Sequence, residues 1–317
     1  MLIEALIEGF HDRPPPADQE NFVDRLRLRR VDRDIFTGWC HAGSPMRAFG
    51  GQVAAQALVA AGATVDDDAR SVHSLHAYFL RPGRTTDHIV YMVDRPRDGR
   101  TFSTRRVRAV QYGEVIFTLS ASFNGPQEGP QHQRGGIPPA WWDHVPAPES
   151  LEPEQVFDHI AMSLDGDRGR RNEVLQQAGY PEQQRFDLRV VEPDQALEAS
   201  GGQFDRMIWL RSVQHLPADQ LLNVCVLTYF SDLNLAGTVT GQHGGRQNAG
   251  AFDVASLDHA MWFHNPFRAV EWNLMATASP AAGHGRGFAR GEFFDHQGVL
   301  TASTAQEVLV RYPFDKG

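Results

Sequence analysis

The chain has 317 residues, a formal net charge of −9 and a hydrophobic fraction of 41%. These values are typical of soluble globular proteins and exclude a wholly disordered or fibrous chain. The acidic charge disfavours general nucleic-acid binding, because contacts with phosphates need a basic surface. Lys316 is the only lysine, which disfavours a Walker-type phosphate loop and a Schiff-base lysine, since each needs a lysine within the fold.

The cysteines and the N-terminal segment limit the class of protein further. Cys40 and Cys225 lie far apart and form no CxxC pair, so a disulfide framework or a zinc ribbon is excluded. No stretch approaches the roughly 18 apolar residues of a membrane span. The sequence begins with MLIEALIEGF, which is acidic and lacks the basic start of a signal peptide. We therefore expect a cytoplasmic protein without a membrane span.

The first part of the chain predicts one buried helix followed by antiparallel strands. The run GGQVAAQALVAAGATV is alanine-rich and apolar on nearly all sides, which indicates a buried helix over 50–65. Alternating runs separated by turn signals, such as Asp98-Gly99, then predict strands; these cover 71–80, 87–94, 101–111 and 114–123. Residues 125–154 are rich in Pro, Gly and Gln and predict a linker, which Trp141 and Trp142 are expected to pin to the body.

The second half of the chain repeats this order. A helix is predicted over 218–233, and strands are predicted over 256–267, 270–279, 286–295 and 299–311. The sequence Phe79-Leu-Arg-Pro82 matches Phe263-His-Asn-Pro266 at an offset of 184 residues, and Gly113 matches Gly298 at 185. Matching residues at strand ends and turns, separated by a near-constant number of residues, indicate a tandem duplication of one domain.

Burial of the helices then predicts the architecture. One apolar helix followed by four or five antiparallel strands is buried only when the sheet wraps around it, and two such units can join their sheets edge to edge. We therefore predict an α+β fold, a double hot dog, with an N-terminal unit at 1–124, a linker and surface excursion at 125–183, and a C-terminal unit at 184–317.

Six segments in a fixed order make the prediction more specific: FGGQVAAQAL, HSLHAYFLRPG, DGRTFSTRRVRAVQ, SDLNL, SLDHAMWFHNPF and GFARGEFFDHQGVLTASTAQEVLVR. With these segments the chain resembles the acyl-CoA thioesterase II family over roughly residues 20–312. The resemblance implies a double hot dog hydrolase of acyl-CoA thioesters that assembles as a dimer or tetramer. We expect no cofactor.

The same resemblance implies catalytic residues, all in the second unit. They are Asp232 in SDLN, Ser256 in ASLDH and Gln306 in ASTAQE, and they would hold a hydrolytic water. Family members often have Thr at the position of Ser256, so this chain keeps the hydroxyl and lacks one methyl group. The chemistry fits, because a carboxylate can take the proton of the water, and a hydroxyl and an amide can fix its position.

Two further groups of residues are candidates for binding substrate. The N–H groups of Gly51 and Gln52 open the first predicted helix and are expected to bind the oxyanion and the substrate, because a helix N-terminus offers free donors and a positive dipole end. Arg105, Arg106 and Arg108 lie in one predicted strand; they either contact CoA phosphates or form a solvated face.

Histidine spacing does not support a metal site. His73 and His76 are three residues apart, and His259 and His264 are five apart. Residues at an odd separation on a strand face opposite sides of the sheet, so neither pair can chelate one ion. We therefore expect no metal.

Two alternative functions remain open. One is a double hot dog enoyl-CoA hydratase or dehydratase, which typically has a D-x-N-P-x-H pattern; here Asp232-Leu-Asn234 is followed by Leu235-Ala236, without the Pro and His. The other is a non-catalytic protein that binds acyl-CoA. The missing Pro and His favour the thioesterase.

Overall fold

A computed structural model describes residue 7 and residues 22–40, 42–44, 47–67, 69–153, 186–244 and 252–312. The second half of the predicted linker, 154–183, and Lys316 lie outside the described residues.

The first half contains one central helix and a set of antiparallel strands. Twelve of the 13 residues of α2 (Gly50–Gly62) are buried, and the helix packs on β6, β7 and β8. The strands and short helices of this half are η1 (Phe22–Leu26), β1 (Arg29–Asp32), β2 (Ile35–Gly38), β3 (Ala42–Ser44), β4 (Arg47–Ala48), β5 (Ser71–Phe79), β6 (Ile89–Asp98), β7 (Phe102–Gln111) and β8 (Glu114–Asn124). The predicted helix and its four predicted strands are confirmed, with shifts of a few residues at their ends.

The second half has the same central arrangement with additional elements. Its main helix is α6 (Gln220–Ser231), and the predicted strand 256–267 is divided into two shorter strands. The elements are η2 (Trp142–His144), η3 (Pro148–Ser150), β9 (Phe186–Val191), α5 (Pro193–Ala199), β10 (Arg206–Ser212), α7 (Leu235–Gly241), β11 (Asp253–Ser256), β12 (Asp258–Phe263), β13 (Asn273–Gly283), β14 (Arg286–Asp295) and β15 (Leu300–Arg311).

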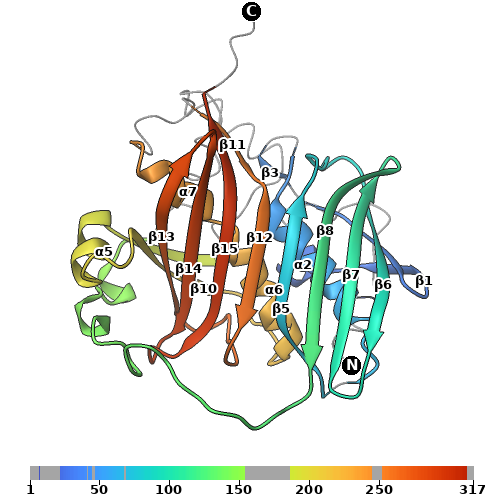
Figure 1. Cartoon of the computed structure of the whole chain (residues 1–317), viewed down its shortest axis with the longest axis horizontal. Helices are drawn as coiled ribbons and strands as arrows, with labels where there is room; N and C mark the ends of the chain where they lie inside the picture. Colours follow the sequence, from blue (N-terminus) through green and yellow to red (C-terminus); the bar gives the residue numbers. More distant parts are fainter. Residues whose placement is uncertain are drawn as a thin grey trace, which may run out of the picture.

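Apart from β3 and β4, which form a separate two-stranded sheet, the strands of both halves form one antiparallel sheet. Its order is β1-β2-β6-β7-β8-β5-β12-β15-β14-β13-β10-β9, and β11 pairs with β15. The two halves join where β5 pairs with β12, in a register that runs from Tyr78 opposite Asp258 to Ser74 opposite Trp262. Figure 1 shows α2 and α6 together behind this seam, and the two helices pack against each other. One hydrophobic cluster runs through both halves between the helices and the sheet.

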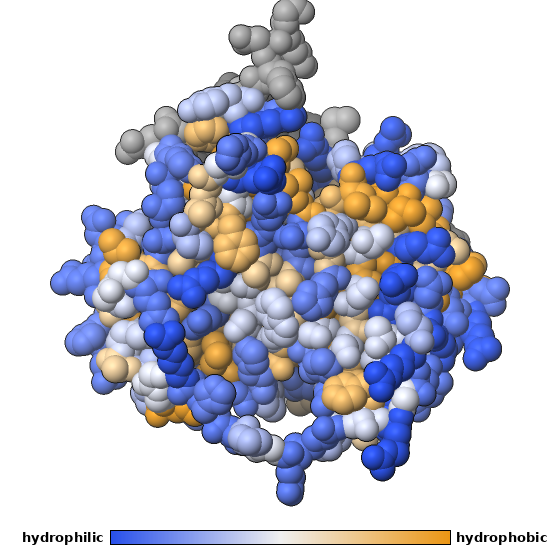
Figure 2. Space-filling model, in the orientation of Figure 1, coloured by the Kyte–Doolittle hydropathy of each residue, from blue (hydrophilic) through white to orange (hydrophobic). Residues whose placement is uncertain are grey.

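The outer face of the sheet is largely polar. Residues on β7 alternate between buried and more exposed positions, as expected for a strand with one face toward the core and one toward solvent. Figure 2, in the same orientation as Figure 1, shows mostly hydrophilic and neutral residues on this face, with a larger hydrophobic group at the upper right and smaller ones elsewhere. The helices therefore lie on the apolar side of the sheet.

The described part of the linker runs along one edge of the molecule from β8 toward α5 (Figure 1). Its two tryptophans pack on the second half: the Trp141 ring lies 5.3 Å from that of Phe294, and the Trp142 ring lies 5.5 Å from that of Trp209. The prediction that this pair pins the segment to the body is confirmed.

Candidate active site

Asp232 lies where the C-terminal end of α6 meets the N-terminal end of α2. It is the C-cap residue of α6 and is half-buried. A Cβ atom at Gly50 would lie 2.6 Å from Oδ2 of Asp232 and 2.7 Å from the ring of Phe79. Such a distance is too short for any side chain at residue 50, so glycine at this position lets the two helix ends meet.

The helix ends also create the electrostatic setting of this carboxylate. A negative charge at a helix C-terminus is unfavourable, whereas the N-terminus of a helix attracts one. The backbone N–H of Gly51 in α2 donates a hydrogen bond to the Asp232 carboxylate. The first turn of α2 therefore offsets part of the cost of placing a carboxylate at the end of α6.

Two strands of the second half bring the other predicted catalytic residues to Asp232. Ser256 ends β11, and its Oγ donates to Oδ1 of Asp232 at 3.2 Å. Gln306 on β15 is fully buried, and its Nε2 donates to Oγ of Ser256 at 2.7 Å and also to the Asp232 carboxylate. The structure thus brings together the three residues that the sequence predicted as catalytic.

A fourth residue extends this hydrogen-bonded group. His259 on β12 is 1% exposed. Its Nδ1 lies 2.6 Å from Oε1 of Gln306, and its Nε2 lies 2.7 Å from Oγ of Ser231. Sequence reasoning considered His259 only as a metal ligand and missed this position.

Burial acts in opposite directions on the two titratable groups. It raises the pKa of Asp232, while His259, the hydrogen bonds from Gln306 and Ser256, and the Gly51 N–H act to lower it. It also lowers the pKa of His259, against the opposing effects of Asp232 and Gln306. A raised carboxyl pKa makes a stronger base, and a lowered imidazole pKa favours the neutral ring.

The two predicted backbone donors lie in different surroundings. Gly51 adjoins Asp232, as described above. The backbone N–H of Gln52 donates a hydrogen bond to the carbonyl oxygen of Phe49 at 3.1 Å. Its fully buried side chain donates to the carbonyl oxygens of Arg25 at 2.9 Å and Trp39 at 3.1 Å. The structure therefore brings the N–H of Gly51 to Asp232, whereas the N–H of Gln52 is already hydrogen-bonded to Phe49.

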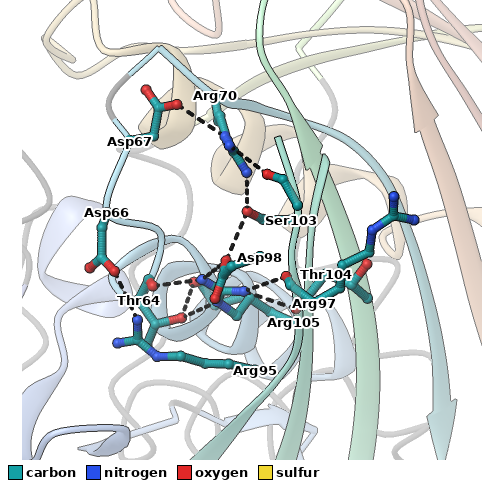
Figure 3. A network of polar contacts seen from close by, with 12 residues as sticks. Thr64, Asp66, Asp67, Arg70, Arg95, Arg97, Asp98, Ser103, Thr104 and Arg105 are labelled. Atoms are coloured by element: carbon teal, nitrogen blue, oxygen red, sulfur yellow. Dashed lines mark hydrogen bonds and ion pairs between the residues drawn. The ribbon is translucent and has the colours of Figure 1, made fainter. Parts of the chain in front are cut away.

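The three arginines of β7 do not form one group. Arg105 is fully buried; its Nη2 lies 2.7 Å from Oδ1 of Asp98, and its Nε donates to Oγ1 of Thr64 at 2.8 Å (Figure 3). By contrast, Arg106 is exposed, and Nε of Arg108 lies 3.9 Å from Asp94. Arg105 is thus neither a phosphate ligand nor part of a solvated face, because its guanidinium joins the loop after α2 to β6 and β7.

Figure 3 shows how this buried network continues toward the surface. Ser103 donates to Asp98 at 2.9 Å and contacts Arg70, which also forms an ion pair of 3.0 Å with Asp67. Burial acts to raise the pKa of Asp98, but hydrogen bonds from Arg105 and Ser103 outweigh it and lower this pKa overall. These contacts join the loop after α2 to β6 and β7, and none of them involves Asp232.

Within the described ranges, no group of three or more His, Cys, Asp or Glu residues could hold a metal ion. No helix in the same part of the chain is long and apolar enough to cross a membrane.

Comparison with known proteins finds the same family along both halves. The sequence profile described as "Acyl-CoA thioesterase" matches residues 181–309, and that described as "Acyl-CoA thioesterase N-terminal domain" matches 37–124. Acyl-coenzyme A thioesterase 8 of Homo sapiens is 34% identical over 309 residues, covering 96% of this chain and 94% of that protein. Acyl-CoA thioesterase 2 of Haemophilus influenzae is 34% identical over 293 residues, covering 92% and 97%.

A solved structure extends the likeness to three dimensions. The crystal structure of the acyl-CoA thioesterase II TesB2 from Mycobacterium marinum superposes with a TM-score of 0.74 at 39% identity, covering 92% of this chain and 98% of that one. Together with the sheet order described above, this likeness confirms the predicted α+β double hot dog.

Proposed function

Because this chain belongs to the acyl-CoA thioesterase family and hydrolyses acyl-CoA thioesters to free acid and CoA, we propose that a water held by Asp232, Ser256 and Gln306 attacks the thioester. The observation that carries the proposal is the direct contact among these three side chains, which come from α6, β11 and β15. Ser256 lies 24 residues after Asp232 and 50 residues before Gln306, so only the fold brings the three together.

Asp232 is the proposed general base. It accepts the proton of the water as the water oxygen attacks the thioester carbonyl, and the thiolate of CoA then leaves. General-base catalysis of this kind is worth on the order of 10²–10⁴-fold in rate. Burial supports the role, because it raises the pKa of Asp232 and so strengthens it as a base.

Ser256 and Gln306 are proposed to position the water. Both side chains bond to the carboxylate that would take the proton, so a water bound beside them lies within reach of Asp232. Fixing the attacking group in this way lowers the entropic part of the barrier. A thioester needs little further activation for hydrolysis, since its carbonyl carbon is electrophilic and the thiolate is a good leaving group.

Gly51 is the proposed donor to the oxyanion. Its N–H lies in the first turn of α2 and donates to ionised Asp232. When Asp232 takes a proton it becomes a weaker acceptor, and the N–H is then released toward the developing negative charge on the carbonyl oxygen. The dipole of α2 favours the same charge.

The competing mechanism makes Ser256 a covalent nucleophile. A nucleophilic serine needs an adjacent base, and Asp232, which accepts from this hydroxyl, would be the base in both mechanisms, so the intermediate distinguishes them. For the water mechanism we expect that enzyme quenched during turnover has the intact mass of the unmodified chain, with no burst of CoA release. An acyl adduct on Ser256 would overturn the water mechanism.

Two variants of Ser256 add a kinetic test. Ser256→Ala removes one hydrogen bond to Asp232 and should lower kcat by about 3–10-fold, since such a bond contributes about 0.5–1.5 kcal/mol. Ser256→Thr restores the hydroxyl and should keep most of the activity. An alanine variant with wild-type kcat would show that the hydroxyl does not position the water.

Location and assembly stay predictions. We propose that the chain acts in the cytoplasm and assembles as a homodimer or homotetramer. Cell fractionation tests the first statement, and light scattering coupled to gel filtration tests the second. A strictly monomeric enzyme with full activity would contradict the predicted assembly.

A further inference from the structure

His259 lies directly behind Gln306 in the sheet. On the neighbouring strands β12 and β15, Ala260 pairs with Ala305, which places His259 opposite Gln306. Both side chains are buried, and their contact of 2.6 Å joins Nδ1 of the ring to Oε1 of the amide. The mechanism above does not use this histidine, although a buried imidazole in contact with a catalytic amide needs a physical explanation.

The direction of each hydrogen bond follows from the carboxylate. An ionised carboxylate only accepts hydrogen bonds, so the hydroxyl of Ser256 must donate to Asp232. The oxygen of Ser256 is then free to accept from Nε2 of Gln306 at 2.7 Å. This places the nitrogen of the Gln306 amide toward Ser256 and its oxygen toward His259.

The tautomer of the imidazole follows in turn. The amide oxygen of Gln306 only accepts, so Nδ1 of His259 must carry a proton. In a neutral ring Nε2 then has a lone pair, and the hydroxyl of Ser231, at 2.7 Å, must donate to it.

Ser231 also lies 2.8 Å from the carbonyl oxygen of Thr228. It has a single proton, and it can donate that proton to Thr228 only when Nε2 of His259 is itself protonated, as in an imidazolium ion. Burial lowers the pKa of His259 and thus favours the neutral ring. Each side chain therefore donates a hydrogen bond to the next, in the order Ser231, His259, Gln306, Ser256 and Asp232.

We propose that His259 is a positioning residue, whose Nδ1–H holds the Gln306 amide with Nε2 toward Ser256 and Asp232. This inference rests on the function proposed above for those three residues. Without the histidine donor, the amide can turn about its terminal torsion, which has a broad, roughly two-fold profile. Turning it would place Oε1 against the oxygen of Ser256 and the carboxylate of Asp232, where two acceptors repel each other and the water is misplaced.

Nitrogen NMR of the full-length enzyme tests the inference independently of catalysis. In protein labelled with ¹⁵N-histidine, the His259 signals are assigned by their loss in His259→Asn. At neutral pH we expect a neutral ring with its proton on Nδ1. A proton on Nδ1 supports the proposal whether the ring is neutral or charged, and a proton on Nε2 alone would overturn it.

Kinetics of three histidine variants provide the functional test. His259→Leu removes the donor and should lower kcat on the order of 10²-fold, as expected when a reacting group is misplaced, with KM changed less than about twofold. His259→Asn places an amide N–H near the former Nδ1 and should recover most of that loss. His264→Asn is the matched control, because His264 follows the same strand but contacts Ser303 at 2.9 Å, away from the site.

The outcomes separate this inference from the proposed function. A folded His259→Leu enzyme with wild-type kcat, alongside an inactive Asp232→Asn enzyme, would overturn the role of His259 and leave Asp232 as the base. Full activity of Asp232→Asn would instead overturn the proposed function, and the NMR result would still decide the tautomer of His259. If His259→Leu fails to fold, the tautomer and the activity of His259→Asn decide the question, and an inactive, folded Asn variant would count against the proposal.

Discussion

The carboxylate of Asp232, at the end of α6, accepts a hydrogen bond from the backbone N–H of Gly51, in the first turn of α2. Each residue belongs to a different half of the chain, so the contact that stabilises the proposed base depends on both halves. This hydrogen bond acts to lower the pKa of Asp232, but the effect of burial is larger and raises that pKa overall.

That raised pKa predicts a pH-dependent cost in stability. A carboxyl whose pKa is higher in the folded than in the unfolded chain favours folding when protonated, and this contribution is lost as the pH rises through the folded pKa. Asp232→Asn stays neutral and should therefore have a higher free energy of unfolding than the wild type at neutral pH. The difference should shrink toward the ordinary carboxyl pKa of about 4.

Urea denaturation of both proteins across this pH range measures the difference. Comparing the two chains at each pH cancels the titration of all other groups that they share. A wild type that is more stable than the Asn variant at neutral pH would mean that the hydrogen bonds to the carboxylate outweigh its burial.

Removal of the Arg105 side chain should affect stability and not turnover. Arg105→Ala leaves a cavity and removes the donor to the two buried oxygens of Thr64, and we expect the free energy of unfolding to fall by about 2–4 kcal/mol. The kcat and KM of the folded fraction should stay unchanged. Arg106→Ala, on the exposed face of the same strand, is the control and should change stability little. A rise in KM for acyl-CoA in Arg105→Ala alone would instead support a contact with CoA phosphates.

Separation of the proposed units should abolish activity. We propose the division predicted from sequence, with an N-terminal unit at 1–124, a linker at 125–183 and a C-terminal unit at 184–317. Chains divided within 125–150 should each be insoluble or inactive alone, because each would expose the seam between β5 and β12 and part of the shared core. Expressing both pieces together should restore activity. A soluble C-terminal piece with full activity would contradict a contribution of the first unit to the site.

The parts of the fold that sequence predicted best are those with strong periodicity or strong apolar character. The helix over 50–65 and the alternating strands fall in this class, because one buried face determines both the element and its orientation. The strands β9 and β10 and the helix α7 were missed. They are short, and tertiary packing determines such elements more than their own sequence does.

The site was predicted in part. Asp232, Ser256 and Gln306 were inferred from family resemblance and lie together in the structure, whereas their spacing alone carried little information. Arg105 could have been placed by alternation, since it shares the inner face of β7 with Val107 and Ala109. The position of His259 depends on which strand pairs with β12, and no local pattern determines a pairing between distant strands.

Steady-state hydrolysis by Asp232→Asn, combined with its affinity for acyl-CoA, tests the central claim most directly. A base acts on the water in the transition state and contributes little to binding of the ground state. We predict that kcat falls by about 10²–10⁴-fold, while acyl-CoA binds the folded variant with nearly unchanged Kd. A folded variant that releases thiol from acyl-CoA at the wild-type rate would contradict the assignment of Asp232 as the catalytic base.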